Sequence, residues 1–267
     1  MAELPNTPTI AAVTMMGIAA VAVFAVVILM FYKYSQRKRN AALMIAVAFT
    51  FWGLAALATF TGALLHLIYA PEAGDIQFSR YGINLGYAFS AMSNIFIVLF
   101  VSEVFSRYPI FRRTKKLIPI LHGIFNGITI GLIVNVFIES SNAVDITEQF
   151  NPDYPLAQTV YHLALTVITL VLLLVFSARS RSQATLLWEK AGFSFIMATA
   201  ITGMLIYVSF VIDLLVQDIW PSIFGSGYTW FNNLGWLFAI VMVNLAYIGF
   251  FMPNWIRNKY KKMEEAK

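Results

Sequence analysis

The amino-acid sequence predicts an all-α membrane protein, a seven-transmembrane-helix bundle with its N-terminus outside and its C-terminus cytoplasmic. Three observations predict this fold class. The 267 residues are 60% hydrophobic and only 12% charged, a balance that soluble globular domains do not have. Seven apolar runs are each long enough to cross a bilayer as a helix. Of the 18 Lys and Arg, all but Arg80 fall in connectors on one side of the predicted membrane, and basic connectors stay in the cytoplasm.

The predicted spans cover about residues 10–32, 41–69, 83–105, 118–138, 156–178, 191–215 and 230–252. Lys33 follows the first span, and Pro71, Pro109 and Pro253 follow the second, third and seventh, where proline interrupts a helix. The first run is too long for the core of a signal peptide and has no basic segment before it, so we expect a retained helix. The connectors are too short for a soluble domain, so we expect one domain over residues 1–267.

The two sets of connectors differ in charge and length. The predicted cytoplasmic set contains Lys33, Arg37, Lys38, Arg39, Arg107, Arg112, Arg113, Lys115, Lys116, Arg179, Arg181, Lys190, Arg257, Lys259, Lys261, Lys262 and Lys267. The longest outer connector, residues 139–155, is acidic and ends in turn-forming residues around two prolines. We interpret it as a lid over the outer ends of the spans. The basic pI follows from membrane orientation, so we expect no nucleic-acid partner.

Polar residues recur every three or four positions in five of the spans, which places them on one face of each helix. Because a polar side chain in hydrocarbon must face protein or water, these faces are expected to point into the bundle. Two interpretations remain open. The deep residues Asn94, Asn126 and Asn244 are expected to make interhelical polar contacts, each worth about 0.6 kcal/mol. A ligand-lined outer vestibule is expected from His66, Tyr87, His162, Asp213, Asn233 and Trp236.

The fourth span carries a different pattern, because Gly123, Gly127 and Gly131 recur every four residues on one face. Small residues at this spacing allow two helix backbones to approach closely. The pattern predicts helix packing on this face. The partner helix is more commonly one of the same chain, and a helix of another protein is the alternative.

Candidate chemistry is sparse. His66, Glu139, His162 and Asp213 lie near outer helix ends and could ligate zinc or respond to pH, but no two of them share a metal-ligand spacing on one helix. We therefore predict neither a metal nor a cofactor. Charged residues are missing from the central third of every span, cysteine is missing altogether, and no hydrolase or nucleotide-binding motif occurs. We expect the protein not to be an enzyme.

Two short segments are similar to motifs of G-protein-coupled receptors. Ser106-Arg107-Tyr108 ends the third span, and Asn244 to Tyr247 lie in the seventh. A serine replaces the acidic residue expected before the arginine, and no proline follows Asn244. The topology resembles that family, and also sensor modules that precede histidine kinases, while the motifs do not establish kinship.

The leading hypothesis is a stand-alone sensor or receptor-like protein of the plasma membrane. Its partners would be the lipid bilayer, a small-molecule ligand on the outer side, and a cytoplasmic or membrane protein reached through the basic inner face. The alternatives are a transporter or channel for a neutral or weakly polar solute, and an accessory or structural subunit of a membrane complex.

Overall fold

The computed structural model describes residues 8–73, 76–114, 116–149, 151–153, 155–219 and 228–266. In these residues seven helices are long and apolar enough to span a membrane, and no strand occurs. The spanning helices are α1 (Ile10–Arg37), α2 (Asn40–Ala73), α3 (Phe78–Val104), α5 (Leu117–Ser141), α7 (Leu156–Gln183), α8 (Leu187–Ile219) and α10 (Trp230–Phe251). Shorter helices are α4 (Pro109–Thr114), α6 (Ile146–Gln149) and α11 (Asn254–Glu265). The chain is therefore a multi-pass helical membrane protein.

The helices extend beyond the predicted spans, since a hydropathy pattern cannot show where a helix continues into polar residues. α2 continues past Pro71, α3 begins five residues earlier than predicted, and α7 runs on to Gln183. Pro109 was expected only to break the chain, but it begins α4, a position at which proline is favoured because its missing N–H would have no helical acceptor. The segment after Pro253 also forms a helix, α11.

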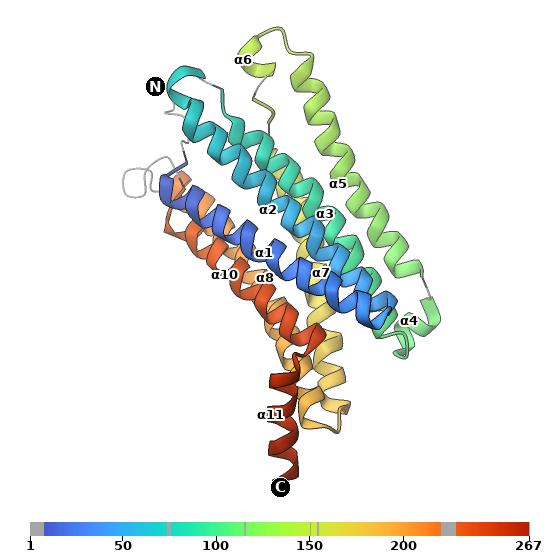
Figure 1. Cartoon of the computed structure of the whole chain (residues 1–267). Helices are drawn as coiled ribbons and strands as arrows, with labels where there is room; N and C mark the ends of the chain where they lie inside the picture. The colour runs from blue at the N-terminus through green and yellow to red at the C-terminus, as the bar shows by residue number, and fades with distance from the viewer. Residues whose placement is uncertain are drawn as a thin grey trace.

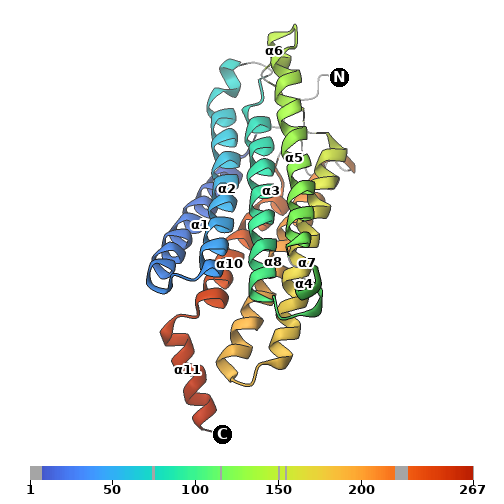
Figure 2. The same cartoon turned by 90° about the vertical axis from the view of Figure 1, so that its right-hand side faces the viewer.

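Six of the spanning helices form a closed ring in the order α1, α2, α3, α7, α8 and α10, with α10 packing back against α1. α5 stands outside this ring and packs on it through α3 and α7, as Figures 1 and 2 show. α11 projects beyond the bundle at the end opposite the start of α1 (Figure 1). We call this end the basic end, because it carries Lys33, Arg107, Arg179 and Arg257, and the opposite end the acidic end.

α2 and α3 make the closest helix contact described. A methyl group added at Gly82 would lie 2.6 Å from the carbonyl oxygen of Ala58, and one at Gly62 would lie 2.8 Å from the Cα of Gly82. A hydrogen at these positions is what lets the two backbones meet. Small residues thus form a tight contact between α2 and α3, a pair of helices that the prediction for the fourth span did not concern.

The predicted packing face of α5 is open. No described atom lies within 4 Å of a methyl group added at Gly123, Gly127 or Gly131. The buried face of α5 lies elsewhere, at His122, Asn126, Thr129, Ile133 and Val136. The intrachain contact expected for these glycines is therefore wrong, because a face of polar and aliphatic side chains, and not the glycines, attaches α5 to the ring.

Most of the predicted polar faces point inward. Asn84, Asn94, His162, Thr166, Thr169, Thr199, Ser209 and Asp213 are all buried. Asn94 Nδ2 donates to Asn126 Oδ1 at 3.3 Å and to Thr166 Oγ1 at 2.8 Å, which joins α3, α5 and α7. Asn244 is the exception: it is exposed, and its amide donates to Ile240 O of its own helix at 2.8 Å. The interhelical contact predicted for Asn244 is wrong, since α10 buries the face that carries Asn232, Trp236, Ala239 and Val243.

Candidate functional site

The ring of six helices lines a partly open cavity of about 160 Å³ in the half of the bundle nearer the acidic end. Every ring helix contributes to its wall, through Met16 (α1), Trp52 (α2), Tyr87 (α3), Thr159 (α7), Tyr207 (α8) and Trp236 (α10). α5 contributes no residue. Since no single helix or hairpin could form this wall, the cavity is a property of ring closure. We call it the ring cavity.

The wall is mainly apolar and aromatic, and two of its residues from α10 carry unpaired polar atoms. Trp236 is 6% exposed and Asn232 is 7% exposed, and both residues line the ring cavity. Within the described residues, Trp236 Nε1 and Asn232 Oδ1 are buried and have no hydrogen-bond partner. The two residues are four apart, so they lie on one face of α10. These two residues of the cavity wall therefore carry one unpaired donor and one unpaired acceptor, and leaving each one unmet costs about 1–3 kcal/mol.

Asp213 lines the same cavity and is 4% exposed. Its Oδ1 accepts a hydrogen bond from the backbone N–H of Thr229 at 2.8 Å and another from the Thr229 hydroxyl. Thr229 is also the N-cap of α10, where its hydroxyl accepts from Phe231 N. The carboxylate thereby connects the end of α8 to the start of α10, and so holds Asn232 and Trp236 in place.

Behind the cavity wall, His162 supports the residues that line it. His162 Nε2 lies 3.1 Å from Ser90 Oγ, and Ser90 Oγ lies 3.0 Å from the hydroxyl of Tyr207. The ring of His162 also packs on Tyr87, with 5.1 Å between the ring centroids. His162 is fully buried and does not itself line the cavity. It positions Ser90, Tyr87 and Tyr207 from the α7 side.

The structure thus brings three of the six predicted ligand-binding residues, Tyr87, Asp213 and Trp236, to one cavity. His66 is placed elsewhere: its Nδ1 lies 2.8 Å from Ser79 Oγ, between α2 and the start of α3. Asn233 is half-buried and does not line the cavity, because its neighbour Asn232 occupies the inward position on α10. The periodicity of the polar residues located the correct half of α10 but missed its inward face by one residue.

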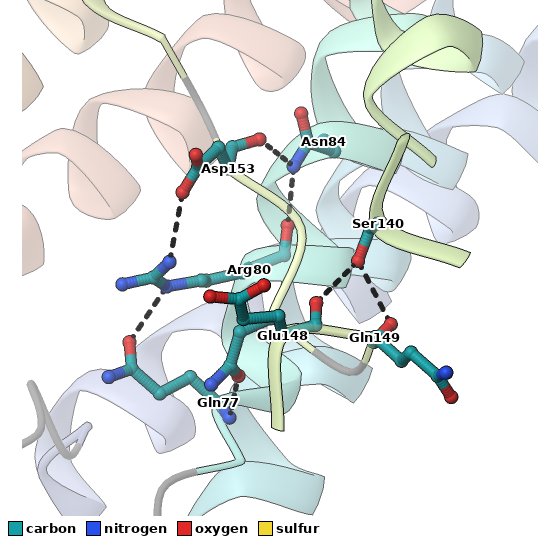
Figure 3. Close-up of polar contacts among 8 residues, drawn as sticks. Gln77, Arg80, Asn84, Ser140, Glu148, Gln149 and Asp153 are labelled. Carbon is teal, nitrogen blue, oxygen red and sulfur yellow. Dashed lines mark hydrogen bonds and ion pairs between the residues drawn. The ribbon is translucent and has the colours of Figure 1, made fainter. Parts of the chain in front are cut away.

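The acidic connector does not cover the cavity as predicted. In Figure 3 it lies across the beginning of α3: Arg80 Nη1 is 3.3 Å from Asp153 Oδ1, and Asn84 Nδ2 donates to Asp153 O at 3.1 Å. Ser140 Oγ donates to the carbonyl oxygens of Glu148 and Gln149 at 2.7 and 2.9 Å (Figure 3). No described residue of 139–153 lines the ring cavity. The connector is fastened to α3 and α5 instead.

This attachment explains why Arg80 lies on the side of the predicted membrane opposite all the other cations. Its side chain also donates from Nε to Gln77 Oε1 at 2.9 Å (Figure 3). Because the Asp153 side chain is 84% exposed, the ion pair itself is worth at most about 1 kcal/mol. The hydrogen bonds to connector carbonyls, including Tyr81 OH to Gln149 O at 2.8 Å, hold the segment in place. The part of the chain described contains no group of three or more His, Asp or Glu that could hold a metal ion.

A second, larger cavity of about 1080 Å³ opens at the basic end. It lies where α3, α7, α8, α10 and α11 come together, and Arg39, Arg107, Trp188 and Arg257 are among its lining residues. We call it the basic crevice. The sequence predicts that these cations share one side of the membrane, but nothing in it indicates that two connectors and α11 converge around a cavity.

Comparison of this chain with protein-family models, with curated proteins and with solved structures finds no match. The class defined by the fold and the cavities is that of an integral membrane protein with seven spanning helices in the described residues.

Proposed function

We propose that this protein is a sensor or receptor-like protein of the plasma membrane that binds a small ligand in the ring cavity. The single observation that carries the proposal is that Trp236 and Asn232, whose Nε1 and Oδ1 atoms are buried without a partner among the described residues, both line a mainly apolar cavity walled by six helices. A ligand that supplies an acceptor and a donor would satisfy both. The absence of catalytic motifs in the sequence favours binding without chemical conversion.

The volume and the wall define the class of ligand. A cavity of about 150 Å³ accepts a benzene-sized molecule, so about 160 Å³ suits an aromatic or branched apolar body of that size. A hydroxyl group both accepts and donates, which matches the Trp236 and Asn232 atoms. Small, weakly polar aromatic alcohols are therefore the preferred ligands.

α10 offers the route by which binding would be reported at the other end of the bundle. The same helix lines the ring cavity through Asn232 and Trp236 and the basic crevice through Gly249 and Phe250. It is tightly packed on α8, since a methyl group at Gly249 would lie 2.9 Å from the backbone N of Ile196. A shift of α10 caused by ligand would therefore alter the basic end, where a partner protein would detect it.

Binding is tested with purified protein and a matched series of toluene, benzyl alcohol and phenol. We expect saturable thermal stabilisation by the hydroxyl compounds that exceeds the effect of toluene, because only they satisfy the polar pair. Trp236→Phe removes the Nε1 donor and should weaken binding of benzyl alcohol about fivefold or more. Trp230→Phe is the matched control, since Trp230 is 82% exposed on the same helix and does not line the cavity.

Signalling is tested separately with a fluorophore on a single cysteine at Ala184, which lines the basic crevice in a chain without cysteine. Benzyl alcohol should change its fluorescence, and Trp236→Phe should suppress the change. Equal responses of the Trp236 and Trp230 variants would refute the ring cavity as the binding site.

A transporter is the second candidate, favoured by the arrangement of cavities. A small cavity of about 30 Å³ shares Trp52 and Tyr207 with the ring cavity and Phe250 with the basic crevice. The three cavities thus follow one another through the bundle, separated by these side chains. Liposome uptake of a small neutral solute that crosses the bare bilayer slowly, and that rises in Tyr207→Ala, would favour this function over sensing.

A further inference from the structure

The basic crevice has a charge distribution that the proposed sensing function does not require. Arg39 follows α1, Arg107 follows α3, and Arg257 lies on α11, yet all three line one cavity of about 1080 Å³. Glu189 is the acidic residue of its described lining. None of the three arginines forms an ion pair with another described residue. The ion pair found among the described residues joins Arg80 to Asp153 instead. Three cations therefore surround one cavity with a single carboxylate to offset them.

Arg257 is prearranged for an anion. Its guanidinium lies 4.8 Å from the centroid of the Trp188 ring, which fixes the plane of the group by a cation–π contact. Its Nε is buried and has no acceptor among the described residues. A fixed guanidinium with a buried unsatisfied donor favours a phosphate or carboxylate oxygen, because the planar fork donates two parallel hydrogen bonds to such groups.

α11 is held in the position that this site needs. Ile256 and Met252 pack with Ala191 of α8, and Glu264 Oε1 accepts from the backbone N–H of Leu187 at the start of α8. These contacts lie on the α8 side of α11 and place Arg257 over Trp188. The guanidinium therefore belongs to the wall of the crevice and not to a free tail.

The deeper wall is apolar. Phe193, Ile196 and Phe250 line the crevice below the arginines, and Ile196 lies two helical turns from Trp188 along α8. The polar residues Tyr108 and Ser180 are already bonded to one another, with 3.1 Å between their hydroxyl oxygens. A soluble phosphate would leave this apolar wall uncovered. A basic rim above an apolar wall matches an amphiphile with an anionic head.

We propose that the basic crevice binds an anionic phospholipid. Its phosphate is held by Arg257, Arg107 and Arg39, and its glycerol and first acyl carbons lie against Phe193, Ile196 and Phe250. The location agrees with this ligand, because basic pockets between spanning helices at the positively charged end bind lipid head groups. The site is distinct from the ring cavity, so the proposal stands or falls without the proposed sensing function.

The experiment uses the full chain in neutral detergent. Dioleoylphosphatidylglycerol and dioleoylphosphatidylcholine are titrated, and binding is followed by native mass spectrometry and thermal shift. We expect the anionic lipid to bind and stabilise and the zwitterionic lipid to do neither. The double variant Arg107→Gln with Arg257→Gln should weaken phosphatidylglycerol binding about tenfold or more, as expected when charge-assisted hydrogen bonds are lost.

The matched control is Arg112→Gln with Arg113→Gln, which removes the same charge from exposed positions of α4 outside the crevice. It should change binding less than about twofold. Equal weakening in both double variants would show diffuse attraction and overturn the proposal. Binding of glycerol 3-phosphate or inorganic phosphate as tight as that of the lipid would overturn the lipid as ligand.

Two single variants keep the proposal testable if the double variant misfolds. Arg107 is exposed, so Arg107→Gln alone should keep the wild-type elution profile and still lose affinity. Arg257→Lys retains the charge but not the planar fork, and should bind phosphatidylglycerol more weakly than the wild type. Wild-type affinity in both single variants would contradict the assignment of these arginines.

Discussion

At the scale of the residue, the structure separates buried amides that join helices from amides that serve only their own helix. Asn94 and Asn126 are 2% and 0% exposed and are bonded to each other. Asn126 also donates from Nδ2 to His122 O at 2.9 Å. The pair connects α5 to the ring, together with the 2.8 Å contact between His122 Nε2 and Thr169 Oγ1.

We predict that Asn94→Ala destabilises the protein by about 1–2 kcal/mol, because it removes the donor to Asn126 Oδ1 and leaves that oxygen buried without a partner. Asn244→Ala should cost less than about 0.5 kcal/mol, since Asn244 is exposed and bonded only to its own helix. Thermal unfolding of both variants in the same detergent measures the difference. A larger loss for Asn244→Ala would contradict the role given to Asn94.

These residues also show what periodicity can identify. Asn94 and Asn244 occupy similar positions in the polar patterns of their spans, yet one is buried and the other exposed. In α10 the inward face is decided by Gly235, where an added methyl group would lie 2.5 Å from the Phe210 ring. That contact with α8 is absent from any pattern within α10 itself.

At the scale of the element, glycines with the same local spacing have opposite roles. Gly82 and Gly86 on α3 lie against α2, and the latter would place a methyl group 2.8 Å from Thr59 Oγ1. Gly123, Gly127 and Gly131 on α5 lie against nothing described. A four-residue glycine repeat therefore indicates that another helix could pack closely on this face. It does not indicate that a helix does so.

We expect Gly82→Ala to destabilise the protein by about 1–3 kcal/mol, because the methyl group would overlap the backbone of α2. Gly127→Ala should leave stability unchanged or raise it by up to about 1 kcal/mol, since alanine favours the helix and the space is open. Melting temperatures of the two variants provide the measurement. Destabilisation by Gly127→Ala in the monomer would show that the α5 glycines are packed after all.

The open face of α5 keeps the accessory-subunit hypothesis testable. Gly127→Leu should not unfold the monomer, and if the face contacts another membrane protein, only the leucine variant should lose that protein on purification. The contrast with Gly127→Ala separates a docking defect from a folding defect, because alanine retains most of the close approach.

At the scale of the whole molecule, seven spans in the described residues bring the start of α1 and α11 to opposite ends of the bundle (Figure 1). The basic connectors predict that the α11 end faces the cytoplasm. Val144, in the connector between α5 and α6, is fully exposed at the other end, and Met263 is half-exposed on α11.

We predict that a membrane-impermeant thiol reagent labels Val144→Cys on intact cells and labels Met263→Cys only after permeabilisation. The parent chain contains no cysteine, so it gives the background directly. Labelling of Met263→Cys alone on intact cells would reverse the orientation. Labelling of both on intact cells would contradict the three spans α7, α8 and α10 that separate these two positions.

The sequence by itself determined that the chain is a helical membrane protein, where its spans lie, and which residues of α3, α7 and α8 face inward. These properties are local, because hydropathy and a repeat of 3.6 residues act within one helix. The tertiary structure alone decided that α5 lies outside a six-helix ring, that Asn232 rather than Asn233 reaches the ring cavity, and that Arg39, Arg107 and Arg257 surround one crevice. Each of these features depends on contacts between residues far apart in the chain. The free energy of such contacts cannot be predicted from the sequence pattern within one helix.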